Sequence, residues 1–137
     1  MASVSTLRDR LKVLLDDIDG LFVYDDWPDS FHAPGAIVLP IETEHELTFG
    51  TTDMSLFQFE IVVAVAQASP LKISQEALDG YTSNTGTNSV RTAIAVDRTL
   101  GGQAHGVFWQ PWTRPDIEPI NGVEYLGQRL PLKVYAS

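Results

Sequence analysis

The chain has 137 residues, enough for one domain with its own core, and it contains no cysteine, which excludes disulfides, thiolate catalysis and cysteine-based zinc sites. Its formal net charge is −9, and the first 60 residues hold twelve acidic and three basic side chains, so we do not expect a protein that binds nucleic-acid phosphates without sequence preference. The N-terminus lacks a signal-peptide pattern, and the longest purely apolar run, Ile61–Ala66, is too short to span a bilayer, so we expect a soluble protein.

An amphipathic helix is expected over Leu7–Asp19. Ser5 or Thr6 can accept a hydrogen bond as its N-terminal cap, and Gly20 suits the left-handed residue that often follows a helix. The apolar face recurs at helical spacing and comprises Val4, Leu7, Leu11, Leu14, Leu15 and Ile18. We expect this face to cover a sheet.

The longest run of strand-forming residues is Leu56–Ala68, and we predict that it lies in the middle of that sheet. One of its faces is apolar throughout and carries Phe57, Phe59, Ile61, Val63 and Val65. The other face becomes apolar only towards the C-terminal end of the strand, at Val62, Ala64 and Ala66. We predict that a helix packs on these three residues.

Two short strands come before this run. Leu21–Tyr24 is followed by an acidic turn around Pro28, and Ala36–Ile41 ends near Pro40, because proline cannot donate to a strand ladder. The polar segment Glu42–Ser55 alternates weakly. We interpret it as an extended hairpin arm or a mobile loop that leaves the body of the domain.

Two helices are expected after the central strand. The first covers Ser69–Tyr81, and its candidate buried positions are Leu71, Ile73, Ala77, Leu78 and Tyr81. The second follows a cap at Asn88 or Ser89 and reaches about Asp97. It is expected to bury Val90 and Ile94.

The C-terminal part is expected to hold two more strands. Ala104–Gln110 is the first of them, and Pro111–Gly122 is interpreted as a proline-stiffened loop rather than a regular element. The last strand, Glu124–Tyr135, contains Gly127 and Pro131, which indicate a bulge or an edge position there.

These elements predict a single α+β domain over residues 1–137. Its architecture is a two-layer sandwich, in which a mostly antiparallel sheet of about five strands packs against the N-terminal helix and the helix pair. The arm at 42–55 and the proline-rich loop at 111–122 leave the body of this domain.

The best candidate for a metal or acid–base site consists of Asp25, Asp26, Asp29 and His32, because hard cations take several oxygen ligands. An exposed acidic turn is the alternative interpretation of the same residues. Pro28-Asp29 also resembles the start of a restriction-type nuclease motif. No acidic residue of the chain is followed two positions later by the lysine that this motif requires, so we discard the nuclease interpretation.

The other histidines do not form a convincing site. His45 lies among the glutamates of the arm, which is a poor platform for catalysis, and no partner in the sequence commits His105 to a dyad. Trp109 and Trp112 could stack on a sugar or a nucleobase, but we favour a protein interface, where tryptophan is enriched. Phe49 of the arm is the third aromatic side chain that we expect at an interface.

Most of the chain resembles a known family. The stretches Leu7–Ser30 and Ser74–Trp109, together with the closing EYLGQRLPLKVYA, are similar to the tail terminator (tail completion) proteins of long-tailed, siphovirus-type bacteriophages, particularly those of actinobacterial phages. In that family a helix pair ends with a Ser-Val-(Arg or Lys) helix start, which a Leu-Gly-Gly turn and a strand follow. Ser89-Val90-Arg91 and Leu100-Gly101-Gly102 match those positions.

The resemblance implies a structural subunit with no reaction, no cofactor and no bound metal. It implies a homohexameric ring at the head-proximal end of the tail tube, in the neck region of the virion, which is assembled in the host cytoplasm, ends tube polymerisation and joins tail to head. The implied partners are further copies of the chain, the tail tube protein and a head-completion or neck protein, with no membrane. Genomic DNA would pass through without specific binding, and we expect Glu42, Glu44 and Glu46 to line the channel.

Two alternatives remain open. Another neck or tail-tube subunit would share the ring but would polymerise into tubes if its two ring faces were complementary. A metal-dependent hydrolase would use Asp25, Asp29 and His32, although no nucleophile pattern accompanies them.

Overall fold

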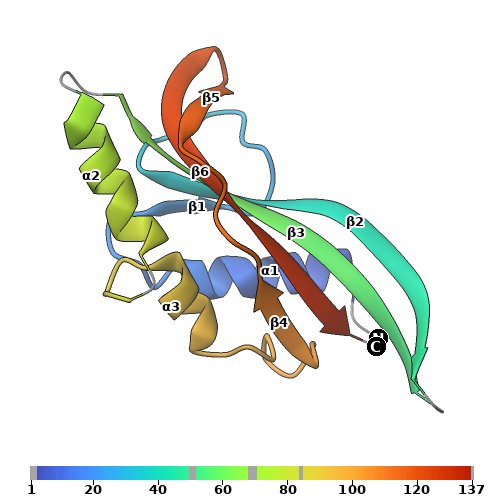
Figure 1. Ribbon diagram of the computed structural model, residues 1–137. Helices are drawn as coiled ribbons and strands as arrows, with labels where there is room; N and C mark the ends of the chain where they lie inside the picture. Colours follow the sequence, from blue (N-terminus) through green and yellow to red (C-terminus); the bar gives the residue numbers. More distant parts are fainter. Residues whose placement is uncertain (1–2, 50–51, 68–70, 84, 137) are drawn as a thin grey trace.

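Six strands and three helices make up the computed structural model of the chain, which describes residues 3–49, 52–67, 71–83 and 85–136 (Figure 1). The helices are α1 (Val4–Leu15), α2 (Leu71–Thr82) and α3 (Val90–Ala95). The strands are β1 (Phe22–Tyr24), β2 (Gly35–Phe49), β3 (Thr52–Ala66), β4 (Gly106–Trp109), β5 (Asp116–Ile120) and β6 (Val123–Ala136). The chain is thus an α+β domain whose helices pack against one mixed sheet, in agreement with the predicted class.

Strand β3 lies in the middle of the sheet, as predicted (Figure 1). The strand order is β1-β2-β3-β6-β4, and β5 also pairs with β6. All pairs are antiparallel except β1 with β2, which is parallel. The sheet therefore has six strands rather than about five, and the additional strand is β5.

One face of β3 builds the main core together with all three helices. Phe59, Ile61 and Val63 on this face are at most 1% exposed. The helices contribute Leu7, Leu11 and Leu15 of α1, Leu78 and Tyr81 of α2, and Val90 and Ile94 of α3 to the same cluster. The predicted burial of this face, of the α1 leucines and of the two α3 residues is confirmed.

The other face of β3 is not covered by a helix, and our prediction there is wrong. Val62 and Ala64 are fully buried, but they pack with Phe31 from the segment before β2 and with Ile120 of β5. Ala66, the third residue of the predicted helix contact, is exposed. Apolar alternation indicates that a face is buried but does not say which element covers it.

Strand β6 has neither a bulge against β3 nor an edge position, contrary to the prediction. Its register with β3 is unbroken from Tyr125 to Ala136, and β5, the segment 110–113 and β4 cover its other side in turn. The Gln110 N donates to the Pro131 carbonyl O at 2.9 Å, so this carbonyl faces away from β3. The Pro131 nitrogen points to the same side as its carbonyl, which is why proline is tolerated at this position. No hydrogen bond of the β3–β6 ladder is therefore lost.

The predicted loop over Pro111–Gly122 contains a regular strand, β5. It turns back into β6 through Asn121 and Gly122, whose φ angles of 53° and 81° fit the two-residue hairpin turn that Asn-Gly pairs favour. Pro119 lies on this edge strand with its nitrogen away from β6, so the pairing loses no donor there.

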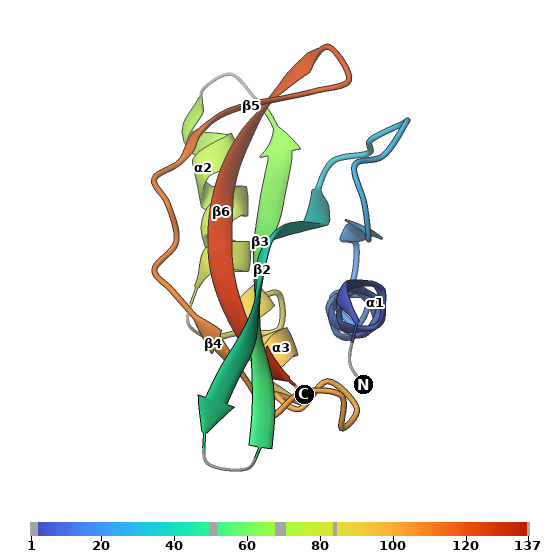
Figure 2. The same ribbon diagram turned by 90° about the vertical axis from the view of Figure 1, so that its right-hand side faces the viewer.

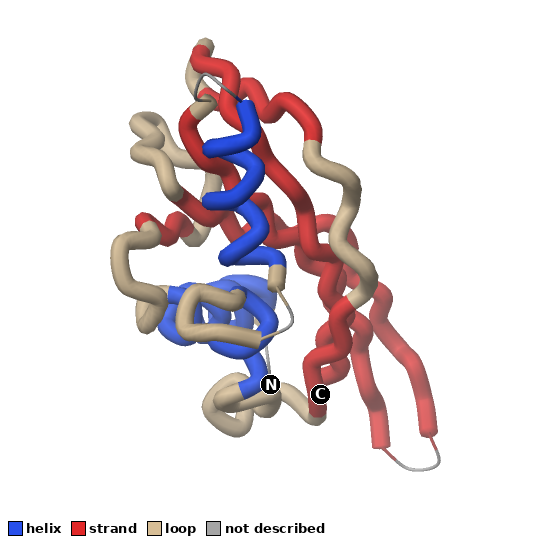
Figure 3. The backbone as a smooth tube through the Cα atoms, turned by 60° about the vertical axis from the view of Figure 1, so that its left-hand side comes forward, coloured by secondary structure: helices blue, strands red, loops and turns tan. Residues whose placement is uncertain are grey.

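Strand β2 is longer than predicted, because it continues through Pro40 to Phe49. The register shifts directly after Pro40, and β1 pairs only with Gly35–Ile37, so Pro40 lies at a bulge on the outer side of the sheet. Before Ser55, β3 pairs with β2 alone, and this hairpin extends past the rest of the sheet (Figures 1 and 3). The structure describes the backbone of residues 42–49 and 52–54 but not their side chains.

Helix α1 is shifted towards the N-terminus relative to the prediction. Its cap is Ser3 rather than Ser5 or Thr6, and the Ser3 hydroxyl accepts from the Thr6 N at 3.1 Å. The helix ends at Leu15, and a series of turns leads to Gly20, whose φ of 79° is left-handed as predicted.

The helix pair follows its prediction in part. Ser89 caps α3 by accepting from the Thr92 N at 3.2 Å, which confirms one of the two predicted caps. In α2, the predicted burial of Leu78 and Tyr81 is confirmed, whereas Ile73 and Ala77 are exposed. The apolar face of α2 is thus narrower than its composition indicates.

Candidate interaction surfaces

The acidic turn after β1 holds the four candidate metal-site residues, Asp25, Asp26, Asp29 and His32. Among the residues that the structure describes, no group of three His, Cys, Asp or Glu side chains is arranged to hold a metal ion. The His32 ring instead lies against the Phe22 ring, with 5.5 Å between their centroids. The structure therefore does not bring these four side chains together as a metal site.

Residues 25–29, which we call the acidic loop, are held in place by polar contacts. The Asp26 carboxylate accepts from the Trp27 N at 2.8 Å, and Asn121 Nδ2 donates to the Pro28 carbonyl O at 3.1 Å. The second bond ties the loop to the β5–β6 hairpin. Trp27 remains 42% exposed, so an aromatic side chain stands among the carboxylates.

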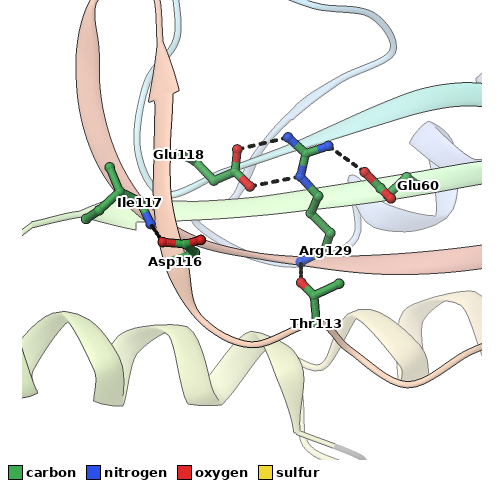
Figure 4. A network of polar contacts seen from close by, with 6 residues as sticks. All are labelled: Glu60, Thr113, Asp116, Ile117, Glu118 and Arg129. Atoms are coloured by element: carbon green, nitrogen blue, oxygen red, sulfur yellow. Dashed lines mark hydrogen bonds and ion pairs between the residues drawn. The ribbon is translucent and has the colours of Figure 1, made fainter.

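The strongest polar cluster centres on Arg129 of β6 (Figure 4). Arg129 Nε donates to Glu118 Oε1 at 2.8 Å and Nη2 donates to Glu118 Oε2 at 3.0 Å, so this pair is bidentate. Nη1 donates to the Glu60 carboxylate of β3. The guanidinium thus joins the β5–β6 hairpin to β3, which is distant from it in sequence.

The side chains of this cluster are largely withdrawn from water. The side chains of Arg129, Glu60 and Glu118 are 34%, 21% and 12% exposed. The hydrogen bonds that Arg129 donates to Glu118, and then the one that it donates to Glu60, raise the pKa of Arg129 above its ordinary value. The arginine therefore stays charged, and it compensates two carboxylates that would otherwise repel one another.

Gly127 leaves the space that the Glu118 side chain occupies. A Cβ at this position would lie 2.6 Å from Glu118 Cγ and 3.0 Å from the Val63 carbonyl O. We therefore expect Gly127→Ala to lower the free energy of unfolding by about 1–3 kcal/mol, the usual range for overpacking. Gly80→Ala is the matched control, because nothing lies within 4 Å of its Cβ and alanine favours a helix. Chemical denaturation that gives both variants the stability of the unmodified chain would contradict this account.

A second surface surrounds Trp109 at the outer strand β4. The guanidinium carbons of Arg91 and Arg98 each lie 4.8 Å from the Trp109 ring centroid, and Arg98 lies 5.6 Å from that of Phe108. Phe108 is 52% exposed, whereas Trp109 is partly buried against the main core. We call Arg91, Arg98, Phe108 and Trp109 the Trp109 surface.

Arg98 also covers the edge of β4. Its Nε and Nη2 donate to the Val107 carbonyl O at 3.2 and 2.8 Å. Gln110 lies three residues after Val107, so the backbone groups of these two residues point to opposite sides of the strand. Because the Gln110 N donates to β6, the Val107 carbonyl faces away from β6. A charged side chain on an edge strand opposes pairing with a further strand. Arg98 therefore hinders the pairing of a further strand with this edge of β4.

The other residues of the predicted interface and of the predicted channel have different surroundings. Trp112 packs against the main core and is partly exposed, and its Nε1 is buried with no hydrogen-bond partner among the described residues. The side chains of the other four, Phe49, Glu42, Glu44 and Glu46, lie outside the described residues, as does that of His45. Their proposed roles stay predictions.

The turn before β4 depends on Asp97. Its carboxylate accepts from Thr99 Oγ1 at 2.6 Å, from the Thr99 N at 3.1 Å and from the Gly101 N at 2.8 Å. These bonds lower the pKa of Asp97, and the bond from the Thr99 side chain has the largest effect. They hold a turn in which Leu100, Gly101 and Gly102 have φ angles of 51°, 70° and 84°.

This lowered pKa predicts an acid-dependent stability. The pKa of Asp97 is lower in the folded state than in the unfolded state, where it is near 4, so its carboxylate stabilises the fold above about pH 4. This contribution to stability is lost as the pH falls through the pKa of the folded state. We expect Asp97→Asn to be less stable than the unmodified chain at pH 7 and to lose less stability between pH 5 and pH 2. Urea midpoints at these pH values measure the effect, with Asp9→Asn as a control. Parallel pH profiles for Asp97→Asn and the unmodified chain would contradict it.

Comparison of the chain with known protein-family models and with curated protein sequences finds no match. Among the described residues, no helix combines the length and the apolar composition that crossing a membrane requires.

Proposed function

We propose that the chain is a tail terminator subunit of a long-tailed bacteriophage. Six copies form a ring at the head-proximal end of the tail tube, where the ring ends tube polymerisation and joins the tail to a neck protein. The chain is then a structural part of the virion. It carries out no reaction.

The observation that carries this proposal is the local structure of the motifs behind the resemblance. Ser89 begins α3 as its cap, and the Leu100-Gly101-Gly102 turn has three consecutive positive φ angles before β4. Glycine adopts such angles without strain, so this turn requires its Gly-Gly pair for a physical reason. The element order around these motifs also follows the family pattern, with a first helix, a short strand and a later helix pair.

The distribution of surfaces on the subunit supports a ring. A closed ring of identical subunits needs two different, complementary patches on each copy. The chain offers distinct features at distant places, namely the β2–β3 hairpin that extends past the sheet, the Trp109 surface and the acidic loop (Figures 1 and 2). None of these features requires a bound cofactor.

Electron microscopy of the purified protein at high concentration separates this proposal from its nearest alternative. A terminator stops after one ring, so we expect isolated discs with six-fold symmetry. A tail-tube subunit has complementary upper and lower ring faces and would form long tubes under the same conditions. Long tubes without discs would overturn the terminator proposal.

The proposed channel makes a further prediction. If Glu42, Glu44 and Glu46 face the lumen, their charges repel DNA phosphates and keep the genome from adhering. Phage particles that carry Glu42→Gln, Glu44→Gln and Glu46→Gln together should then eject DNA more slowly or retain part of it. Glu76→Gln on α2 is a control of the same chemistry. Ejection kinetics that match those of the unmodified phage would count against a channel position.

A further inference from the structure

Arg98 gives the Trp109 surface a positive charge that pairs with no carboxylate among the described residues. Among the described residues, the ion pairs involve Arg129, Lys12 and Lys72 but not Arg98. Arg98 is exposed, although it stacks on Trp109 and donates to Val107. A guanidinium fixed by stacking loses little conformational entropy when it binds a carboxylate, and it has donors left for one.

The chain holds an uncompensated acidic surface elsewhere. No lysine or arginine occurs between Lys12 and Lys72, whereas the acidic loop in that interval contains three aspartates. On α1 the acidic residues are interspersed with basic ones, and Asp16 is paired with Lys12 at 3.0 Å. The acidic loop also exposes Trp27, whose ring can stack on a guanidinium.

These two surfaces lie at opposite ends of the molecule. The acidic loop is near the β5 end of the sheet, and β4 with α3 is at the other end, in both views (Figures 1 and 2). One copy therefore cannot bring them together. Two copies in a head-to-tail arrangement can do so, and the arrangement leaves one surface of each kind free for the next copy.

We propose that the Trp109 surface binds the acidic loop of a second copy of this chain, with Arg91 and Arg98 facing the carboxylates of Asp25, Asp26 and Asp29. This inference rests on the proposed ring and names the contact that builds it. A duplex nucleic acid is the other anionic ligand to consider. Two stacked arginines on a chain of net charge −9 form too small a basic footprint for it.

Charge reversal with complementation tests this contact. Arg98→Glu and the double variant Asp26→Arg with Asp29→Arg should each associate on the order of tenfold more weakly than the unmodified chain, because each places like charges opposite one another. An equal mixture of the two variants should recover association. Each copy then offers one unmodified surface and one reversed surface, and both kinds of contact in the mixture join opposite charges.

Three controls accompany the association measurements. Lys72→Glu makes the same change of charge near the start of α2, at a distance from both surfaces, and should associate like the unmodified chain (Figure 1). Arg98→Lys keeps the charge and should lose only part of the association. Arg91→Glu, which leaves the Arg98 hydrogen bonds to Val107 in place, serves as the second reversal variant if Arg98→Glu fails to fold.

The outcomes separate this inference from the proposed function. Variants that associate like the unmodified chain, or a mixture of folded variants that does not recover, would overturn the contact and leave the ring to another surface. Recovery in open chains rather than closed discs would support the contact and contradict the terminator. An unmodified chain that stays monomeric but binds a DNA duplex, with binding lost in Arg98→Glu, would overturn the contact in favour of nucleic acid.

Discussion

Replacing Arg129 with alanine is expected to lower the free energy of unfolding by roughly 2–3 kcal/mol, between the values for exposed and for buried ion pairs. The substitution leaves the Glu60 and Glu118 carboxylates facing one another in a site where their side chains are 21% and 12% exposed. It also removes the polar link that the guanidinium makes between β5 and β3. The effect stays below that of a fully buried pair because the Arg129 side chain keeps a third of its surface in water.

Two variants distinguish charge compensation from packing at this site. Arg129→Lys retains the charge but cannot make the bidentate contact to Glu118, so we expect a loss of about 1 kcal/mol. Arg129→Met combined with Glu60→Gln and Glu118→Gln removes all three charges and should recover most of the loss in Arg129→Ala. Urea denaturation at pH 7 measures all three. A triple variant as unstable as Arg129→Ala would contradict the role of charge.

Replacing Phe59 with alanine is expected to cost about 3–5 kcal/mol, the usual range for a buried phenylalanine. Phe59 is 1% exposed at the centre of β3 and belongs to the cluster that joins the sheet to all three helices. Few groups can move into the cavity, because the sheet lies on one side of it and packed helices on the other.

Phe108→Ala is the matched control for Phe59. Phe108 is also a strand phenylalanine, but it is 52% exposed on β4. We expect its replacement to cost less than about 1 kcal/mol, as for most surface substitutions. Thermal unfolding compares the two variants directly. Equal losses of stability in Phe59→Ala and Phe108→Ala would contradict the division between a main core and an exposed surface at β4.

Local sequence signals predicted the centre of the fold. Strict alternation from Phe57 to Val65 predicted β3, and the polar residues before an apolar helical pattern predicted that α3 begins at Asn88 or Ser89. The sequence does not predict β5, because the prolines of Pro111–Gly122 favour an irregular loop. Asn121-Gly122 directly after it is a hairpin signal that could have located both strands.

Contacts between distant parts of the chain could not be predicted from the sequence. Glu60 and Arg129 are 69 residues apart, and no local pattern indicates that one guanidinium serves two carboxylates. The stacking of Arg91 and Arg98 on Trp109 likewise depends on how the helix pair packs beside β4. Sequence composition located the acidic excess in the first 60 residues but not the two arginines that stack on Trp109.

The proposed ring is tested most directly by the mass of the purified chain in solution. Light scattering over a concentration series, with negative-stain images of the same fractions, should give a species of six chains and discs with six-fold symmetry. A chain that remains monomeric at every concentration, and that also leaves the ends of tail tubes uncapped when mixed with them, would contradict the assignment as a tail terminator.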